Sequence, residues 1–180
     1  MRIFSSKGFS LVETMIALGV LTTGVLGAAA VLASGMQNLS SSPFDVVTTQ
    51  KAAEAMEAVF SARQSGKLTW AQIKNVNGAS GSDGGVFIDG PQALKLPGPD
   101  GLVNTADDTT VEVIQLPGKD QLLNTSDDQY LTLTSFTREI KIRDVSTENG
   151  QLRSIIVTVK YQNGPTTRSY TLTTYISSYS

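Results

Sequence analysis

The pattern of apolar and polar positions divides the first third of the chain into two helical stretches. Residues 14–44 contain no charged side chain, and residues 14–36 are apolar on all sides of a helix. At about 1.5 Å per residue, a helix over residues 14–36 is roughly 30–35 Å long, enough to cross the apolar core of a bilayer. A core helix of this length normally has a polar face. The pattern therefore favours a membrane-spanning helix over a buried core helix, with Thr22 and Thr23 hydrogen-bonded to backbone carbonyls.

Glycines interrupt this apolar stretch. Each of them weakens a helix by about 1 kcal/mol relative to alanine. They allow close packing against another helix, and they equally allow the segment to stretch or unwind inside an assembly. The sequence leaves both interpretations open for Gly19, Gly24, Gly27 and Gly35.

An amphipathic pattern follows the apolar stretch. Residues 45–63 place apolar side chains at helical spacing on one face, and these are Ala52, Met56, Val59 and Phe60. Pro43 suits the first turn of a second helix and equally a kink within one long helix. We expect residues 37–64 to form the amphipathic second half of a long N-terminal helix and to lie against a globular head.

Beyond residue 65 the pattern changes to the period of β-structure. Residues 152–161 alternate cleanly, with one face made by Ile155, Val157, Val159 and Tyr161. Residues 168–177 alternate again, and a turn signal at residues 162–165 makes the two a hairpin. Further candidate strands lie at residues 111–116, 131–136 and 138–145. The predicted fold class is α+β: a long N-terminal helix packed on an antiparallel sheet, with residues 65–180 as a β-rich head.

Composition narrows the classes of function. The chain has 180 residues, enough for one domain, and a formal net charge of −2 that gives no reason to expect nucleic acid as a partner. It contains no histidine and no cysteine, which excludes a Ser-His-Asp triad, a cysteine nucleophile, a histidine-based zinc site and disulfides. Asp107 and Asp108 are a poor acid–base pair, because a turn does not hold them at the separation that glycosidases use. We expect a protein that is not an enzyme.

Charged residues around the start of the apolar stretch form a motif. Arg2 and Lys7 precede it, Gly8 and Phe9 follow these cations, and Glu13 stands at the entrance to the apolar stretch. An ordinary secretory signal, cut among the small residues after the apolar run, would explain the cations. It would not explain Glu13, because a carboxylate at the membrane entrance is unfavourable without a partner.

The stretch KGFSLVETMIAL resembles the N-terminal signal of type IV pilins and of type II secretion pseudopilins. The resemblance covers residues 1 to about 36, and it implies that residues 1–8 are a leader. A membrane-embedded prepilin peptidase would cut between Gly8 and Phe9 and would methylate the new amine of Phe9. Glu13 would then pair with the cationic amine of Phe9, either in a neighbouring subunit or within one chain before assembly, and the sequence does not choose between the two.

The resemblance implies a function by assembly. The C-terminal hairpin is loosely similar to that of minor pilins of the PilV type, although many pilins close a C-terminal loop with a disulfide that this chain cannot form. The implied protein is a minor pilin of a type IV pilus. It would reside in the bacterial inner membrane with a periplasmic head, and would then enter the filament and help to initiate it. The implied partners are prepilin peptidase, other pilins or pseudopilins and the inner-membrane assembly platform.

Two alternative functions stay open at this point. The first is a pseudopilin of a type II secretion system, which carries the same N-terminal motif. The second is a single-pass anchored domain outside the membrane that binds calcium or another ligand.

An internal repeat places carboxylates at matched positions. Residues 96–108 (LPGPDGLVNTADD) are nearly copied at residues 116–128 (LPGKDQLLNTSDD). Oxygen ligands at short intervals in a turn suit Ca²⁺, and the first copy resembles acidic calcium loops of some pseudopilins and extracellular repeat proteins. Solvated acidic turns without an ion explain the same pattern.

The first copy is the favoured calcium site, with the candidate ligands Asp100, Asn104, Asp107 and Asp108. In the second copy Gln121 replaces a glycine and Lys119 adds a positive charge, which weakens the case for its candidate ligands Asp120, Asn124, Asp127 and Asp128. A strand at residues 111–116 would put the loops at its opposite ends, so we expect two separate sites. Calcium would be structural, with no cofactor needed for activity.

Overall fold

A computed structural model describes residue 8 and residues 10–77, 84–145 and 151–179, without the side chains of residues 37–42. Arg2, Lys7 and Phe9, for which the sequence predicts roles, lie outside the described residues. The chain forms two compact units, Met1–Ser42 and Pro43–Ser180, and each is described separately below.

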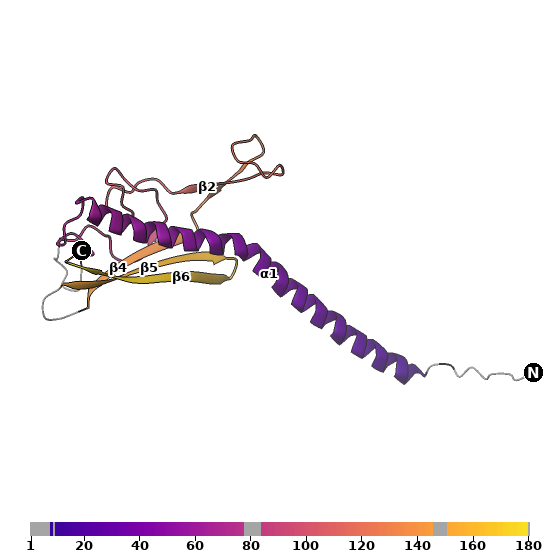
Figure 1. The fold of residues 1–180 in the computed structure, drawn as a ribbon. Coiled ribbons are helices and arrows are strands. Elements are labelled where there is room, and N and C mark those ends of the chain that lie inside the picture. Colours follow the sequence, from indigo (N-terminus) through magenta and orange to yellow (C-terminus); the bar gives the residue numbers. More distant parts are fainter. Residues whose placement is uncertain (1–7, 9, 78–83, 146–150, 180) are drawn as a thin grey trace, which may run out of the picture. The chain divides into compact units, whose positions relative to one another are not determined.

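One helix, α1, runs from Leu11 to Gln64 with Pro43 inside it (Figure 1). Of the two interpretations of Pro43, the structure therefore has the single continuous helix. The helix ends two residues before a glycine. Gly66 adopts a left-handed φ of 72°, and its N–H and that of Leu68 donate to the carbonyls of Arg63 and Ala62 at 3.1 Å, as in a glycine-based helix cap.

The second unit is built on a four-stranded antiparallel sheet with the strand order β1-β4-β5-β6. The strands are β1 Gln92–Ala93, β4 Phe136–Asp144, β5 Leu152–Asn163 and β6 Thr166–Ser177. β5 and β6 pair along their whole lengths, from Leu152↔Ser177 to Asn163↔Thr166. The two residues between them are Gly164, with a φ of 59°, and Pro165. This combination fits a type II′ turn, because proline excludes the second positive φ that type I′ requires. The predicted hairpin is confirmed.

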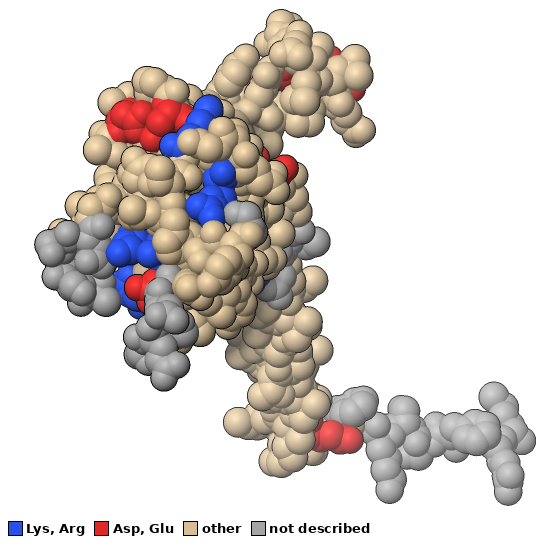
Figure 2. Space-filling model, turned by 60° about the vertical axis from the view of Figure 1, so that its left-hand side comes forward, with Lys and Arg blue, Asp and Glu red and all other residues tan. Residues whose placement is uncertain are grey.

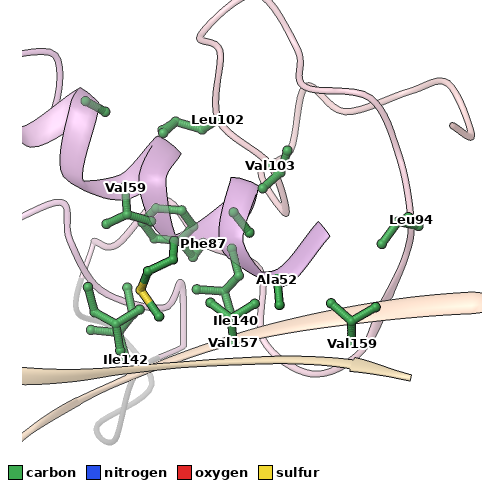
Figure 3. Packing of buried hydrophobic residues seen from close by; sticks show 14 of the residues in the cluster. Ala52, Val59, Phe87, Leu94, Leu102, Val103, Ile140, Ile142, Val157 and Val159 are labelled. Atoms are coloured by element: carbon green, nitrogen blue, oxygen red, sulfur yellow. The ribbon is translucent and has the colours of Figure 1, made fainter. Parts of the chain in front are cut away.

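The core lies between one face of this sheet and the part of α1 that belongs to the second unit. Ala52 and Val59 of α1 lie over Ile140 of β4 and Val157 of β5 in Figure 3, and all four are fully buried. The predicted helix face is confirmed, since Met56 is also buried and Phe60 packs against the cluster. The predicted face of β5 is confirmed as well, because Ile155, Val157, Val159 and Tyr161 are all buried.

Polar and aromatic contacts fasten the start of this helical part to the sheet. The hydroxyl of Tyr161 donates to Asp45 Oδ1 at 2.7 Å, and Arg168 pairs with Asp45 Oδ2 at 3.1 Å. Phe44 packs its ring against the rings of Phe136 and Tyr161, with centroids 5.8 and 5.6 Å away. The amphipathic half of α1 is therefore held on the sheet from its first turn onward.

A separate two-stranded ribbon is made by β2, Val113–Leu116, and β3, Gln129–Thr132. We predicted residues 131–136 as one strand of the main sheet, and this was wrong. The chain turns at Thr134 and Ser135, where the N–H of Phe136 donates to the carbonyl of Leu133 at 3.3 Å, and β4 begins at Phe136. Leu131, Leu133 and Phe136 all contribute to the core, so their apolar pattern looks like one strand although a turn separates two.

Candidate functional sites

The described part of the N-terminal motif consists of Gly8, Ser10 and Glu13. Gly8 is exposed and precedes the helix. Glu13 lies exposed in the first turn of α1, and its backbone N–H donates to Ser10 Oγ at 3.2 Å. Within the described residues no cation pairs with the Glu13 carboxylate. The partner that the sequence predicts, the amine of Phe9, exists only after the chain is cut.

Ser10 caps the start of α1, a structural role that the sequence interpretation missed. The order Ser-x-x-Glu at residues 10–13 is the signature of a capping box, in which the serine hydroxyl accepts from the third residue of the helix. The observed bond from the Glu13 N–H to Ser10 is half of that arrangement. A carboxylate in the first turn is also favourable toward the positive end of the helix dipole. Glu13 thus has a local structural role besides any role in assembly.

The first 26 residues of α1, Leu11–Met36, form a helix with a mean hydropathy of 2.2 that is long and apolar enough to span a membrane. None of it is buried, so the alternative of a buried core helix gains no support. Apart from an acidic side chain at its start, the helix face seen in Figure 2 carries no charge. Thr22 and Thr23 donate to the carbonyls of Leu18 and Val20 at 2.6 and 2.9 Å, as predicted, which makes their hydroxyls compatible with an apolar environment.

The glycines of this segment are not required by packing within the described chain. A methyl group placed on Gly19, Gly24, Gly27 or Gly35 would meet no other atom within 4 Å. Glycine is costly inside a helix, and no contact among the described residues requires it here, so both interpretations from the sequence stay open. Close approach of another helix is one of them.

The sequence repeat is also a repeat of backbone conformation. Gly101 and Gln121, at matched positions, have φ angles of 75° and 58°, and Asn104 and Asn124 have 62° and 66°. In both copies an aspartate side chain accepts from the backbone two residues on, from Leu102 to Asp100 at 2.7 Å and from Leu122 to Asp120 at 2.9 Å. The third residue of each copy, Gly98 or Gly118, lies directly beside an aspartate carboxylate. A methyl group on Gly98 or Gly118 would lie 2.3 Å from an oxygen of Asp107 or Asp127.

In the first loop, residues 96–108, two of the predicted calcium ligands have structural roles. Asp108 is buried and accepts from the N–H groups of Gly98 at 3.0 Å and Asn104 at 2.6 Å. Asn104 is also buried, and its side chain is hydrogen-bonded to Arg138 of β4. The loop therefore uses its carboxylate and amide oxygens to fix its own backbone on the sheet.

The second loop, residues 116–128, brings three carboxylates together. One oxygen each from Asp120, Asp127 and Asp128 lies within 4.8 Å of the others. Among the described residues, this is the group of acidic side chains close enough to share one cation, and it belongs to the copy that the sequence ranked second. The predicted ligand Asn124 is exposed, and the structure records no contact of its side chain.

Hydrogen bonds favour the ionised form of two of these carboxylates, Asp127 and Asp128. The hydroxyl of Thr125 lowers the pKa of Asp127, with help from the N–H groups of Lys119 and Asp120. Thr105 lowers the pKa of Asp107 in the same way in the first loop. For Asp128, desolvation raises the pKa, but bonds from Thr125 and Gln115 outweigh it and the pKa is lowered. In the second loop these bonds therefore stabilise the negative charge of Asp127 and Asp128.

The two loops occupy different places in the second unit. The first precedes β2, next to an isolated bridge between Lys95 and Val111, and lies against the core. The second joins β2 to β3 and forms the tip of their ribbon, beyond the pair Leu116↔Gln129 (Figure 1). The two loops thus lie at the two ends of β2, as the sequence predicts.

Comparison of the chain with models of protein families, with characterised proteins and with solved structures finds no match. The interpretation of the two sites therefore rests on the residues themselves.

Proposed function

We propose that the chain is a minor pilin: a filament subunit that is anchored in the bacterial inner membrane and assembles through its N-terminal helix. The observation that supports this most is the junction at the start of α1. In the sequence a glycine and an aromatic residue, Gly8 and Phe9, come directly before an apolar helical segment, Leu11–Met36, none of which is buried. Its third residue, Glu13, is its one charged residue. The protein would act by assembly and not by catalysis.

The first step would be hydrolysis of the peptide bond between Gly8 and Phe9 by prepilin peptidase. Water adds across the bond, so that the leader leaves with a carboxylate on Gly8 and the mature chain begins with an amine on Phe9. Transfer of a methyl group from S-adenosylmethionine to that amine breaks the methyl–sulfur bond, releases S-adenosylhomocysteine and gives a secondary amine. This amine loses one proton in the reaction and is still protonated, and therefore cationic, at neutral pH. Gly8 is exposed, and no atom lies within 4 Å of the position of a side chain there, so the peptidase would reach this bond without unfolding any described residue.

The second step would pair Glu13 with the new amine. Removing two opposite charges from water is costly, and it is tolerated only if the charges meet. Inside a filament of packed apolar helices, a single axial stagger between neighbouring helices would bring the Glu13 carboxylate to the amine of the next subunit. The pair would therefore set the register of assembly. The exposed apolar surface of Leu11–Met36 would be covered by lipid before assembly and by neighbouring helices after it.

The experiment that tests this proposal is co-expression of the full chain with a prepilin peptidase, followed by intact mass measurement. We expect loss of residues 1–8 and the gain of one methyl group. Gly8→Val should abolish both changes, and Gly24→Ala is the matched control, because its added methyl group also meets no atom within 4 Å. An intact N-terminus on the unsubstituted chain would refute the pilin proposal and leave a single-pass anchored domain. Correct processing would support the pilin proposal and its relative, the secretion pseudopilin, together.

A second candidate function, binding of calcium by the head, is favoured by one observation: the approach of Asp120, Asp127 and Asp128 within 4.8 Å. Three carboxylate oxygens at that spacing match the hard oxygen ligands that Ca²⁺ takes. The bound ion would hold the tip of the β2–β3 ribbon in one conformation. It would be a structural ion, and it is compatible with the role in assembly.

A further inference from the structure

The two copies of the repeat have the same backbone conformation, but their apolar side chains differ in exposure to solvent. In the first copy Leu102 and Val103 are 3% and 8% exposed. At the matched positions of the second copy, Leu122 and Leu123 are 61% and 55% exposed. Two adjacent leucines at the tip of a ribbon cost free energy in water, roughly in proportion to their apolar area.

The difference comes from the surroundings and not from the loops themselves. In the first copy Leu102 and Val103 belong to the same buried cluster as Ala52 and Val59 of α1, and Figure 3 shows them beside that helix. The first loop is therefore seated on α1 by its apolar pair. The second loop has the same shape, with matched φ angles and matched aspartate bonds. Within the part of the chain that the structure describes, it has no such seat.

A groove of suitable character lies further along the same helix. It has a volume of about 510 Å³ and runs between α1 and β2, where its apolar lining is Pro43, Val46, Val47, Ile114 and Leu116. Val46 is 55% exposed. Lys51 also borders the groove, but its charge is paired with Glu54 and Glu112, so the groove presents apolar surface and no free charge from this lysine.

The ribbon's own tip does not reach this groove. β2 and β3 remain paired up to Leu116↔Gln129, and Leu116 is itself part of the groove wall. The loop therefore continues past the end of the wall and projects from the ribbon, as Figure 1 shows. Among the described residues nothing fills the groove and nothing covers Leu122 and Leu123, and a second copy of the chain would supply both an occupant and a seat.

We propose that the loop 117–128 of one copy docks, through Leu122 and Leu123, into the groove between α1 and β2 of a second copy. The loop would then sit on α1 in the way that the first loop already sits on it, at a part of the helix that includes Pro43, Val46 and Val47. Asp120 and Asp127 would stay at the rim in water. The contact joins different patches of the two copies, so it is head-to-tail and propagates from copy to copy. The inference goes beyond the proposed function, because it does not depend on cleavage at Gly8.

The absence of cysteine from the sequence makes disulfide cross-linking a clean test. Full-length chains carrying Leu123→Cys and full-length chains carrying Val46→Cys, with tags of different size, are mixed in detergent micelles and oxidised. We expect a mixed disulfide between the two chains as the main product. The matched control replaces Val46→Cys with Val145→Cys, another exposed valine, at the end of the main sheet. Association through the membrane segment alone would cross-link both mixtures equally, and that result would overturn the proposal.

A second measurement does not depend on cysteine reactivity. The double substitution Leu122→Ser with Leu123→Ser changes only exposed side chains, so the fold is retained. We expect it to weaken self-association in analytical ultracentrifugation by roughly tenfold to a hundredfold, as for two leucines that no longer leave water. Tyr179→Ser, which removes another exposed apolar group, should leave association unchanged. Unaltered self-association of the double variant, or cross-links only between two Leu123→Cys chains, would overturn the docking geometry.

Discussion

The side chain of Asn104 is joined to Arg138 by two hydrogen bonds of 2.7 Å. The amide Nδ2 donates to the carbonyl of Arg138, and Arg138 Nε donates to the amide Oδ1. Arg138 is 1% exposed and is the largest of the fully buried side chains. Burial lowers its pKa, an effect that Asp108 and Glu112 oppose. Asn104, which the sequence suggested as a calcium ligand, thus accepts a hydrogen bond from a buried guanidinium group.

This relationship predicts that Asn104→Ala destabilises the second unit. The substitution leaves a buried N–H of Arg138 without its acceptor, which costs about 1–3 kcal/mol. Asn124→Ala is a matched control, because Asn124 has nearly the same positive φ, 66° against 62°, but is exposed. The backbone strain of alanine at a left-handed position is then the same in both variants. Denaturant unfolding of the full chain in detergent should show the larger loss for Asn104→Ala, and equal losses would show that the bonds to Arg138 contribute nothing.

The sequence predicted the regular parts of the fold because periodicity reports burial directly. The faces of β5 and of the amphipathic half of α1 were found from Val157 and Ala52 and their neighbours. It failed where a residue's role depends on a distant partner. The residues near Asn104 in the sequence do not indicate that its partner is Arg138. The residues near Leu122 do not indicate that this leucine is exposed while the matched Leu102 is buried in the core. The sequence identified the matched carboxylates of both loops. It could not tell that three carboxylates of the second loop lie within 4.8 Å of one another, because that depends on how each loop folds.

Substitutions of Ser10 and Glu13 can distinguish helix capping from the proposed ion pair at the start of α1. Ser10→Ala removes the acceptor of the Glu13 N–H and should cost about 1 kcal/mol of helix stability. Glu13→Gln keeps that backbone bond and removes only the charge. If the proposed ion pair sets the register, Glu13→Gln should reduce incorporation into filaments by about tenfold or more, because the amine of Phe9 is left unpaired in an apolar setting. Ser10→Ala should assemble nearly as well as the original chain. Equal incorporation of both variants would count against the ion pair.

The hydroxyl of Thr125 predicts a specific change in the titration of Asp127. It is the largest cause of the lowered pKa of Asp127, so Thr125→Val should raise that pKa toward 3.8, the ordinary value. Carboxyl carbon chemical shifts followed by NMR through the acid range would show the change. Thr105→Val should act on Asp107 in the first loop in the same way. A titration of Asp127 that does not respond to Thr125→Val would show that the backbone N–H groups alone hold its charge.

The lowered pKa of Asp127 also determines whether its charge stabilises the fold at high or at low pH. A carboxylate whose pKa is lower in the folded state stabilises the fold above its ordinary pKa, and this contribution is lost as the pH falls through the folded value. Thr125→Val should therefore be less stable than the original chain at neutral pH, and the difference should disappear in strong acid. A difference that persists unchanged at low pH would assign the effect of Thr125 to packing instead of charge.

Calcium should stabilise the protein through the second loop and not through the first. A ligand that binds only the folded state raises the melting temperature, and the rise grows with the logarithm of ligand concentration above its Kd. We expect this behaviour in a thermal-shift series with calcium against chelator. Asp120→Asn with Asp127→Asn should remove it, because two of the three gathered carboxylates are neutralised. Asp100→Asn with Asp107→Asn, the same change at matched positions of the first loop, should leave the response intact, because the first loop does not gather its carboxylates in this way. Two outcomes would contradict this prediction. If the first-loop variant lost the response, calcium would bind at the first loop, which the sequence favoured. If the original chain gave no response, both loops would be acidic turns that are fixed by their own hydrogen bonds.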